Sequence, residues 1–184
     1  WSSEAQVAAD KFWPGPLTMV LPLLPESNIS SLALAGLQTV AVRIPEHPIA
    51  QKILKLSNTP LAAPSANPSG TVSATKAEHV ISRLSGKIEG IISGKASKIG
   101  LESTIISVST EASILRYGAI EAAEISDVLG INLKKPEQDE KISAPGQLSS
   151  HYAPRGSIRL NSKTIKENEV HLGFGEVDSD LNLS

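Results

Sequence analysis

The sequence contains no cysteine, which excludes disulfide bonds and thiolate metal sites. Its histidines, His47, His79, His151 and His171, are too scattered along the chain to predict a metal cluster. There is no signal-peptide pattern and no apolar run long enough to span a bilayer, so we expect a soluble, cytoplasmic protein. The formal net charge of -2 gives no overall attraction to phosphate backbones, so any contact with nucleic acid would need a local patch.

The length and composition predict a folded chain rather than a disordered one. With 184 residues and 40% apolar composition, the chain can form one full domain and part of another. The first residue is Trp1 rather than methionine, and the chain begins inside a helical pattern and stops after a polar run at Ser184. We therefore expect a fragment of a longer protein.

Helical and strand-like patterns alternate along the first 130 residues, which predicts an α/β domain with a twisted, mixed sheet. Ser3 is the expected N-cap of the first helix, and Thr75 with Glu78 forms a capping-box pattern for a later one. The expected helices cover residues 4–12, a segment from Pro48, 75–84 and 121–129, and the expected strands cover 17–21, 38–44, 61–63, 88–92, 103–108 and 113–117.

A change in composition predicts a domain boundary. Residues 131–154 are rich in Lys, Pro, Glu, Gln and Ser and lack apolar periodicity, which is typical of a linker. Residues 157–160 and 169–174 look like strands of a second domain. The expected organisation is a domain at 1–130, a linker at 131–154 and the start of a small second α/β domain at 155–184.

The short segment Pro64-Ser65-Ala66-Asn67-Pro68-Ser69-Gly70 follows the apolar run 61–63. If that run is a buried strand, the small hydroxyl and amide side chains would lie at the mouth of the sheet, where ligands commonly bind. The same residue types also form ordinary surface turns, so both interpretations remain open on this segment alone.

Five sequence blocks together resemble the threonylcarbamoyl-AMP synthase family, the YrdC-like proteins. The segment APGQLSSHYAP at 144–154 is similar to the one that joins the two domains in the two-domain members. This chain has Tyr117 where many relatives have proline, and it does not include the family's upstream KxR motif. The five blocks are KFWPGPLT at 11–18, TVAVRIPEHP at 39–48, APSANPSG at 63–70, GLEST at 100–104 and LRYGAI at 115–120.

The resemblance implies a YrdC-like twisted mixed sheet flanked by helices, and it implies a reaction. L-threonine, bicarbonate and ATP would form threonylcarbamoyl-AMP and pyrophosphate, with ATP as a substrate accompanied by Mg²⁺. The product would serve a downstream threonylcarbamoyl transferase complex that modifies tRNA. Positioning and charge neutralisation would supply most of the catalysis, so no acid or base residue and no protein-bound metal is assigned.

The resemblance also implies roles for individual residues. Arg43, Ser65 and Ser103 would bind L-threonine, and Arg43 would hold its carboxylate, because arginine suits bidentate contact. The residues expected at ATP are Thr39, Asn67, Thr75, Arg116 and Ser149. Several of these residues have a simpler interpretation: a surface ion pair for Arg43, strand formation for Thr39, turn formation for Ser65 and Asn67, and helix capping for Thr75.

Two other classes of function remain open. The related YciO-type proteins suggest an RNA-binding module without synthase activity, with tRNA or double-stranded RNA as the partner. A carbamoyl-transfer accessory domain is the third possibility, and the linker at 144–154 argues against it.

Overall fold

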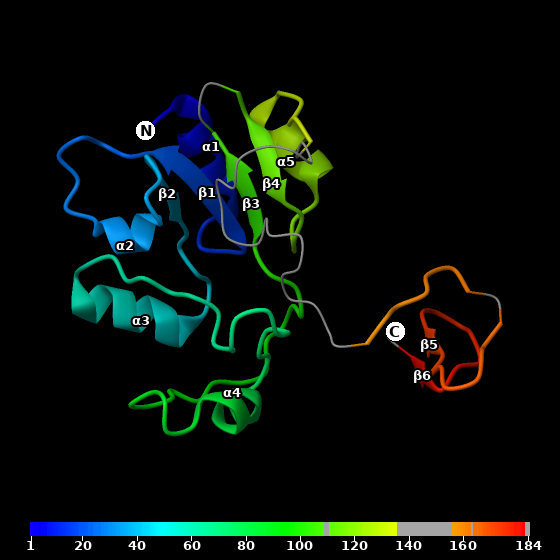
Figure 1. Ribbon diagram of the computed structural model, residues 1–184. Helices are drawn as coiled ribbons and strands as arrows, with labels where there is room; N and C mark the ends of the chain where they lie inside the picture. Colours follow the sequence, from blue (N-terminus) through cyan, green and yellow to red (C-terminus); the bar gives the residue numbers. More distant parts are fainter. Residues whose placement is uncertain (109–110, 136–155, 163, 183–184) are drawn as a thin grey trace. The chain divides into compact units, whose positions relative to one another are not determined.

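The computed structural model describes residues 1–108, 111–135, 156–162 and 164–182. The chain divides into two compact units, Trp1–Ala153 and Pro154–Ser184. The larger unit is a mixed sheet flanked by helices, so the expected α/β class is confirmed (Figure 1). Its elements are α1 (Ser3–Phe12), β1 (Leu17–Pro22), α2 (Ser31–Leu34), β2 (Thr39–Val42), α3 (Pro48–Ser57), α4 (Ala77–Leu84), β3 (Thr104–Ser107), β4 (Ser113–Arg116) and α5 (Ala122–Leu129).

The four strands of the larger unit lie in the order β2-β1-β3-β4. Strand β1 pairs antiparallel with β2 and parallel with β3, and β3 pairs antiparallel with β4. Because successive side chains of a strand point to opposite faces, Leu17 and Met19 lie on one face of the sheet and Thr18 and Val20 on the other.

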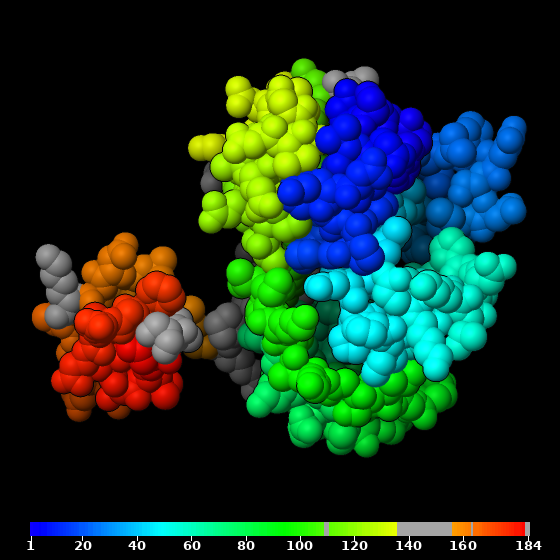
Figure 2. Space-filling model, turned by 180° about the vertical axis from the view of Figure 1, so that it is seen from behind, coloured from blue at the N-terminus to red at the C-terminus, as the bar shows by residue number. Residues whose placement is uncertain are grey.

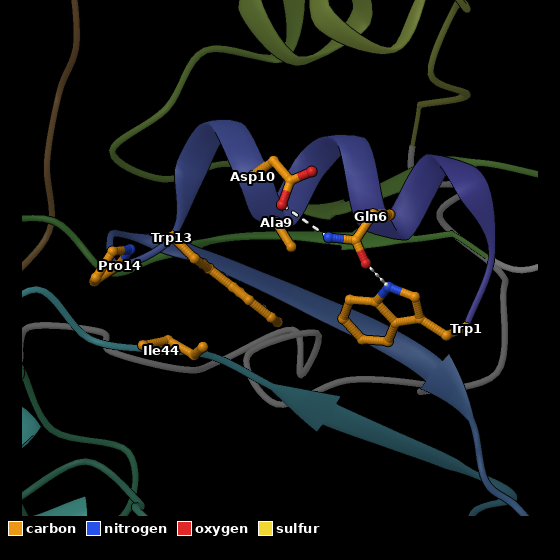
Figure 3. Close-up of a pocket in the computed structure, with 7 residues that line it drawn as sticks. All are labelled: Trp1, Gln6, Ala9, Asp10, Trp13, Pro14 and Ile44. Carbon is orange, nitrogen blue, oxygen red and sulfur yellow. Dashed lines mark hydrogen bonds between the residues drawn. The ribbon is translucent and has the colours of Figure 1, made fainter. Parts of the chain in front are cut away.

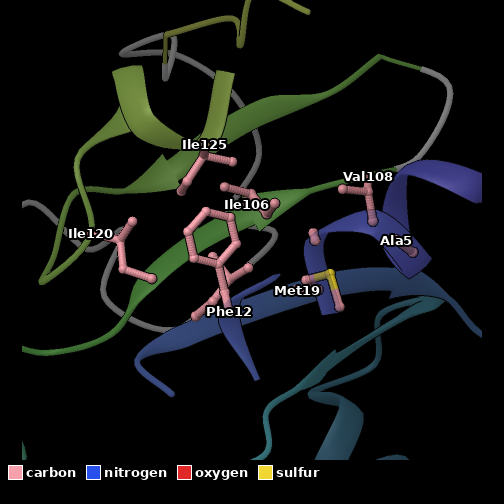
Figure 4. Packing of buried hydrophobic residues seen from close by; sticks show 9 residues of the cluster. Ala5, Phe12, Met19, Ile106, Val108, Ile120 and Ile125 are labelled. Carbon is pink, nitrogen blue, oxygen red and sulfur yellow. The ribbon is translucent and has the colours of Figure 1, made fainter. Parts of the chain in front are cut away.

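Helices α1 and α5 cover the face that carries Leu17 and Met19. Ala5, Ala8 and Phe12 follow one another at helical spacing on α1, and all three are buried against the sheet. Figure 4 shows Phe12 among Ile106, Ile120 and Ile125 of the same core. In the view from behind, α1 and the segment of α5 lie side by side (Figure 2), in agreement with their direct packing. The opposite face carries the polar Thr18 beside a smaller apolar cluster of Val20, Ile105 and Leu115, and we call it the polar face.

A β-bulge in strand β4 decides which side chains reach that polar face. Ile105 pairs with Arg116, whereas Ile106 pairs with Ile114, so Leu115 is the extra residue between them. A bulge turns two consecutive side chains toward the same face. Leu115 packs with Ile105 and Val20, and Arg116 lies beside Ile105 on that face.

Two expected strands, at 61–63 and 88–92, are wrong. Both segments lack regular secondary structure, and their apolar side chains are exposed, with Leu61 at 47% and Ile92 at 68%. An apolar run becomes a strand only when a neighbouring strand satisfies its backbone groups, and neither segment pairs with a strand in the described part of the chain. The length of an apolar run does not reveal whether such a partner exists.

The other differences concern helix starts and short elements. Ser2, not Ser3, caps α1 by accepting a 3.2 Å hydrogen bond from the backbone N–H of Ala5. Helix α4 begins at Ala77 without a side-chain cap, so the capping box at Thr75 is wrong. The short helix α2 was not expected from the sequence.

In the smaller unit, β5 (Leu172–Gly173) lies within the expected strand 169–174 and pairs in parallel with β6 (Leu181–Asn182). The expected strand at 157–160 is wrong, because this segment has no strand pairing among the described residues. Arg159 instead forms an ion pair with Glu169. This contact, with a backbone hydrogen bond from Lys166, holds the pKa of Glu169 at about 2.

Candidate functional site

A row of side chains crosses the polar face of the sheet. Thr18 pairs with Ile105 across β1 and β3, and Ile105 pairs with Arg116 across β3 and β4. Arg43 directly follows Val42, the last residue of β2, which pairs with Met19 of β1. Ser103 precedes Ile105 by two residues and therefore lies on the same face. The fold thus brings together residues that are distant in the sequence.

Ser103 is the centre of this row and is only 7% exposed. The Arg116 guanidinium donates hydrogen bonds from Nε and Nη2 to the backbone carbonyl of Ser103, at 3.1 and 2.9 Å. Nη2 also donates to Ser103 Oγ at 3.0 Å. On the other side, Ser103 Oγ lies 2.8 Å from Thr18 Oγ1. Arg116 and Thr18 therefore both contact the Ser103 hydroxyl.

Arg43 is fixed at the other end of the row by the turn before β1. Its Nε donates a 2.9 Å hydrogen bond to the carbonyl of Gly15, and the Gly15 N–H donates to the carbonyl of Ile44 at 2.8 Å. Partial burial and the positive charge of Arg116 lower the pKa of Arg43. It remains far above neutral pH, because a guanidinium in a protein stays protonated. The second cause of the lowered pKa is repulsion between the two guanidinium charges.

The Arg116 guanidinium on the Ser103 hydroxyl, together with the Arg43 charge that interacts with it, forms a positive site suited to an anionic oxygen. Among the residues that the structure describes, Arg43 has no carboxylate within ion-pair distance. A carboxylate or phosphate bound there would reduce the repulsion between the guanidinium groups and accept charge-assisted hydrogen bonds. The arrangement can therefore bind and orient an anion.

The position of Ser103 is fixed from behind by Thr104 and Gly118. Thr104 is fully buried, and its Oγ1 donates to the Ile120 carbonyl at 2.7 Å and accepts from the Ile120 N–H at 2.9 Å. A side chain at Gly118 would collide with the backbone of Glu102, Ser103 and Thr104, each at 2.5 Å. The segment 118–120 therefore packs directly against the backbone that carries Ser103.

The other residues predicted for the site are not in contact with this row in the described part of the chain. Asn67 closes its own turn, donating at 3.0 Å to the carbonyls of Pro68 and Thr71, while its buried Oδ1 has no partner among the residues that the structure describes. Thr75 Oγ1 lies 3.4 Å from His79 Nδ1. Ser65 is exposed, and Ser149 lies outside the described residues.

Thr39 lies on β2, on the same face as Arg43 but at the opposite end of the strand, where it pairs with Pro22. Ser73, three residues after the segment 64–70, donates a 2.8 Å hydrogen bond from its Oγ to the Glu102 carboxylate, next to Ser103. Ser73, Glu102 and Thr18 were all missed from the sequence. For Thr18, a usable signal was its alternation with Leu17 and Met19, which places its hydroxyl on the face away from the helices.

A separate shallow pocket lies between α1 and the turn that follows it (Figure 3). Trp13 packs against the core there and donates from Nε1 to the Leu17 carbonyl at 2.7 Å, so it anchors the turn to the core. No predicted site residue lines this pocket. The lining residues are Trp1, Gln6, Ala9, Asp10, Trp13, Pro14 and Ile44.

Comparison with known families places these observations in context. The Sua5/YciO/YrdC family model, described as telomere recombination, matches residues 1–118. A second model, described as the C-terminal domain of threonylcarbamoyl-AMP synthase, matches residues 120–180. The chain belongs to the Sua5/YciO/YrdC family, and the resemblance noted from the five sequence blocks is confirmed.

The chain is similar to curated proteins named threonylcarbamoyl-AMP synthase. It is 43% identical to the protein of Bacillus subtilis over 161 residues, which is 85% of this chain and 46% of that protein. It is 43% identical to the protein of Pyrococcus abyssi over 160 residues, covering 84% of this chain and 46% of that one. The chain therefore spans about half the length of these relatives.

The fold is similar to those of two solved structures. The crystal structure of P. abyssi Sua5 complexed with L-threonine matches with a TM-score of 0.82 and 37% identity, over 99% of this chain and 59% of that one. Escherichia coli YciO matches with a TM-score of 0.54 and 22% identity, over 64% of this chain and 56% of that one, which shows a shared fold alone.

Two features are absent from the described residues. No group of three or more histidine and acidic side chains there could hold a metal ion. A search of the same residues finds no helix with the length and apolar character needed to cross a membrane.

Proposed function

We propose that this chain is part of an L-threonylcarbamoyladenylate synthase, which forms threonylcarbamoyl-AMP and pyrophosphate from L-threonine, bicarbonate and ATP. The observation that carries the proposal is the Arg43–Ser103–Arg116 row, placed in a chain that is 43% identical to curated synthases. The threonine complex of P. abyssi Sua5 supports threonine as the amino acid.

In this proposal each end of the row binds a different substrate. Arg43 holds the carboxylate of L-threonine, and the Ser103 and Ser65 hydroxyls orient the amino acid. Arg116 contacts a phosphate or the ribose of ATP, and the remaining contacts to ATP come from Thr39, Asn67, Thr75 and Ser149. We propose that Mg²⁺ accompanies the triphosphate and is held mainly by phosphate oxygens, as is usual for nucleotide-bound magnesium.

The chemistry then needs orientation more than proton transfer. The threonine amine forms a carbamate with bicarbonate and water is released, and a carbamate oxygen then attacks the α-phosphorus of ATP while the bond to pyrophosphate breaks. Because threonine carbamate is unstable in water, a site that holds both substrates close together raises the rate by proximity and by charge neutralisation. Arg43 and Arg116 supply positive charge for the carboxylate and phosphate groups.

The division into residues 1–130, a linker at 131–154 and a second domain from 155 stays a prediction within this proposal. Transfer of the product to a threonylcarbamoyl transferase complex, binding of tRNA or double-stranded RNA, and a location in the cytoplasm stay predictions as well.

Pyrophosphate release by the full-length protein tests the proposal. We expect release from ATP only when L-threonine and bicarbonate are both present, because the carbamate is the nucleophile. L-valine serves as the matched control, since it has the shape of threonine without the hydroxyl, and should support much less release. Pyrophosphate release that is unchanged when threonine is omitted would rule out the synthase.

A further inference from the structure

The Thr18 hydroxyl lies against Ser103, and the proposed function assigns it no role. Thr18 is half-buried on the polar face of β1, and its Oγ1 is 2.8 Å from Ser103 Oγ. The contact joins residues 85 positions apart in the chain. A threonine on a strand is often only a good strand former, so the hydrogen-bond geometry decides whether it does more.

A serine hydroxyl has one proton to donate and two lone pairs that accept. The guanidinium of Arg116 can only donate, so its 3.0 Å contact uses one lone pair of Ser103 Oγ. If Thr18 donates to the second lone pair, the Ser103 proton is left for a ligand. If Ser103 donates to Thr18, the ligand faces a lone pair.

The charge around Ser103 selects between these two directions. The Arg116 guanidinium lies 3.0 Å from Ser103 Oγ and its charge also acts on Arg43, so the region is positive and favours an anion. An anionic oxygen only accepts hydrogen bonds, and a lone pair of Ser103 would repel it. The chain of donation from Thr18 to Ser103 to the anion satisfies every group.

We propose that Thr18 is a positioning residue: it donates to Ser103 Oγ and thereby directs the Ser103 proton to an anionic oxygen of the substrate. The identification of that oxygen as the carboxylate of L-threonine rests on the proposed function. The direction of the hydrogen bond rests instead on the positive charge around Ser103, which favours an anionic ligand of any kind.

The first test is kinetic and uses the full-length protein. Thr18→Val keeps the shape of the side chain and removes the hydroxyl, and we expect it to raise the KM for L-threonine about three- to tenfold. The KM for ATP and kcat should change by less than about twofold, because the hydroxyl contacts neither phosphate nor the reacting atoms. Thr18→Ser should restore the threonine KM to within about twofold of the wild-type value.

A double-mutant cycle separates positioning from a structural effect. In a Ser103→Ala background, Thr18→Val should have no further effect on the threonine KM, because the hydroxyl it orients is already gone. Thr59→Val is the matched control for the substitution, since Thr59 is exposed in a loop after α3. Full additivity of Thr18→Val and Ser103→Ala would overturn the positioning role.

Calorimetric titration with sodium sulfate gives a readout that is independent of turnover. Sulfate should bind more weakly to Thr18→Val than to the wild type or Thr18→Ser.

If the wild type showed no threonine-dependent turnover but this sulfate pattern held, the proposed function would be wrong and the role of Thr18 would stand. The role of Thr18 would be wrong if wild-type turnover were normal and Thr18→Val changed neither the threonine KM nor the sulfate affinity. It would also be wrong if Thr18→Ser were as impaired as Thr18→Val. A wild type with neither turnover nor sulfate binding would overturn both.

Discussion

Replacing Arg43 by alanine in the full-length protein is expected to lower kcat/KM for L-threonine by roughly 30-fold to several thousand-fold, which corresponds to about 2 to 5 kcal/mol. The Gly15 carbonyl fixes the Arg43 guanidinium, whose charge interacts with that of Arg116, so Arg43 presents a positive charge to a bound carboxylate. The KM for L-threonine should rise most and the KM for ATP should change less. Steady-state kinetics with each substrate varied in turn measures both constants.

Three comparisons make this result specific to the guanidinium. Arg43→Lys should recover only part of the loss, because an ammonium group cannot bind a carboxylate in the bidentate geometry. Ser65→Ala should cost less, about 1 to 3 kcal/mol, since it removes one hydrogen bond rather than a charge. Lys52→Ala, which removes an exposed positive charge from α3, should leave both constants unchanged. If Arg43→Ala raised the ATP constant alone, Arg43 would be a phosphate ligand and its carboxylate role would be wrong.

Thr104→Val should lower the free energy of unfolding of the larger unit by about 2 to 4 kcal/mol. The Thr104 hydroxyl is fully buried and pairs with both the N–H and the carbonyl of Ile120, at 2.9 and 2.7 Å. Valine fills the same space but leaves both backbone groups without a partner in the core. Urea denaturation followed by tryptophan fluorescence measures the change.

Thr104→Ser is the matched control, because it keeps the hydroxyl and removes only a methyl group, at a cost of about 1 kcal/mol. Valine should therefore be the more harmful substitution although it is the more apolar one. A valine variant as stable as the serine variant would show that the two hydrogen bonds contribute little to the stability of the fold.

Local sequence patterns were sufficient for the part of the fold that builds the site. A strand-like apolar run predicted β1, alternation predicted β2, one apolar face predicted α1, and a segment closed by Gly130 predicted α5. Each of these elements packs against a single core. The five sequence blocks identified the family and pointed to Arg43, Ser103 and Arg116. In the structure Arg116 contacts Ser103, and the charge of Arg116 acts on Arg43. Their roles toward substrates stay predictions.

The rest depended on contacts between distant segments. The bulge at Leu115, which turns Arg116 to the polar face, comes from the pairing of β3 with β4 and leaves no local signal. The Thr18–Ser103 contact requires that β1 and β3 be neighbours, although 85 residues separate the two side chains. The expected strand at 88–92 failed for the same reason, because no strand lies beside it in the described part of the chain.

The most direct test of the synthase proposal is mass spectrometry of the product that the full-length protein makes from ATP, L-threonine and isotopically labelled bicarbonate. We expect an AMP adduct of threonine that contains one additional carbon, which comes from bicarbonate and carries the label. The label should disappear when unlabelled bicarbonate is supplied, and the adduct should not form without threonine. An unlabelled threonine–AMP adduct, or ATP hydrolysis without any adduct, would contradict the assignment.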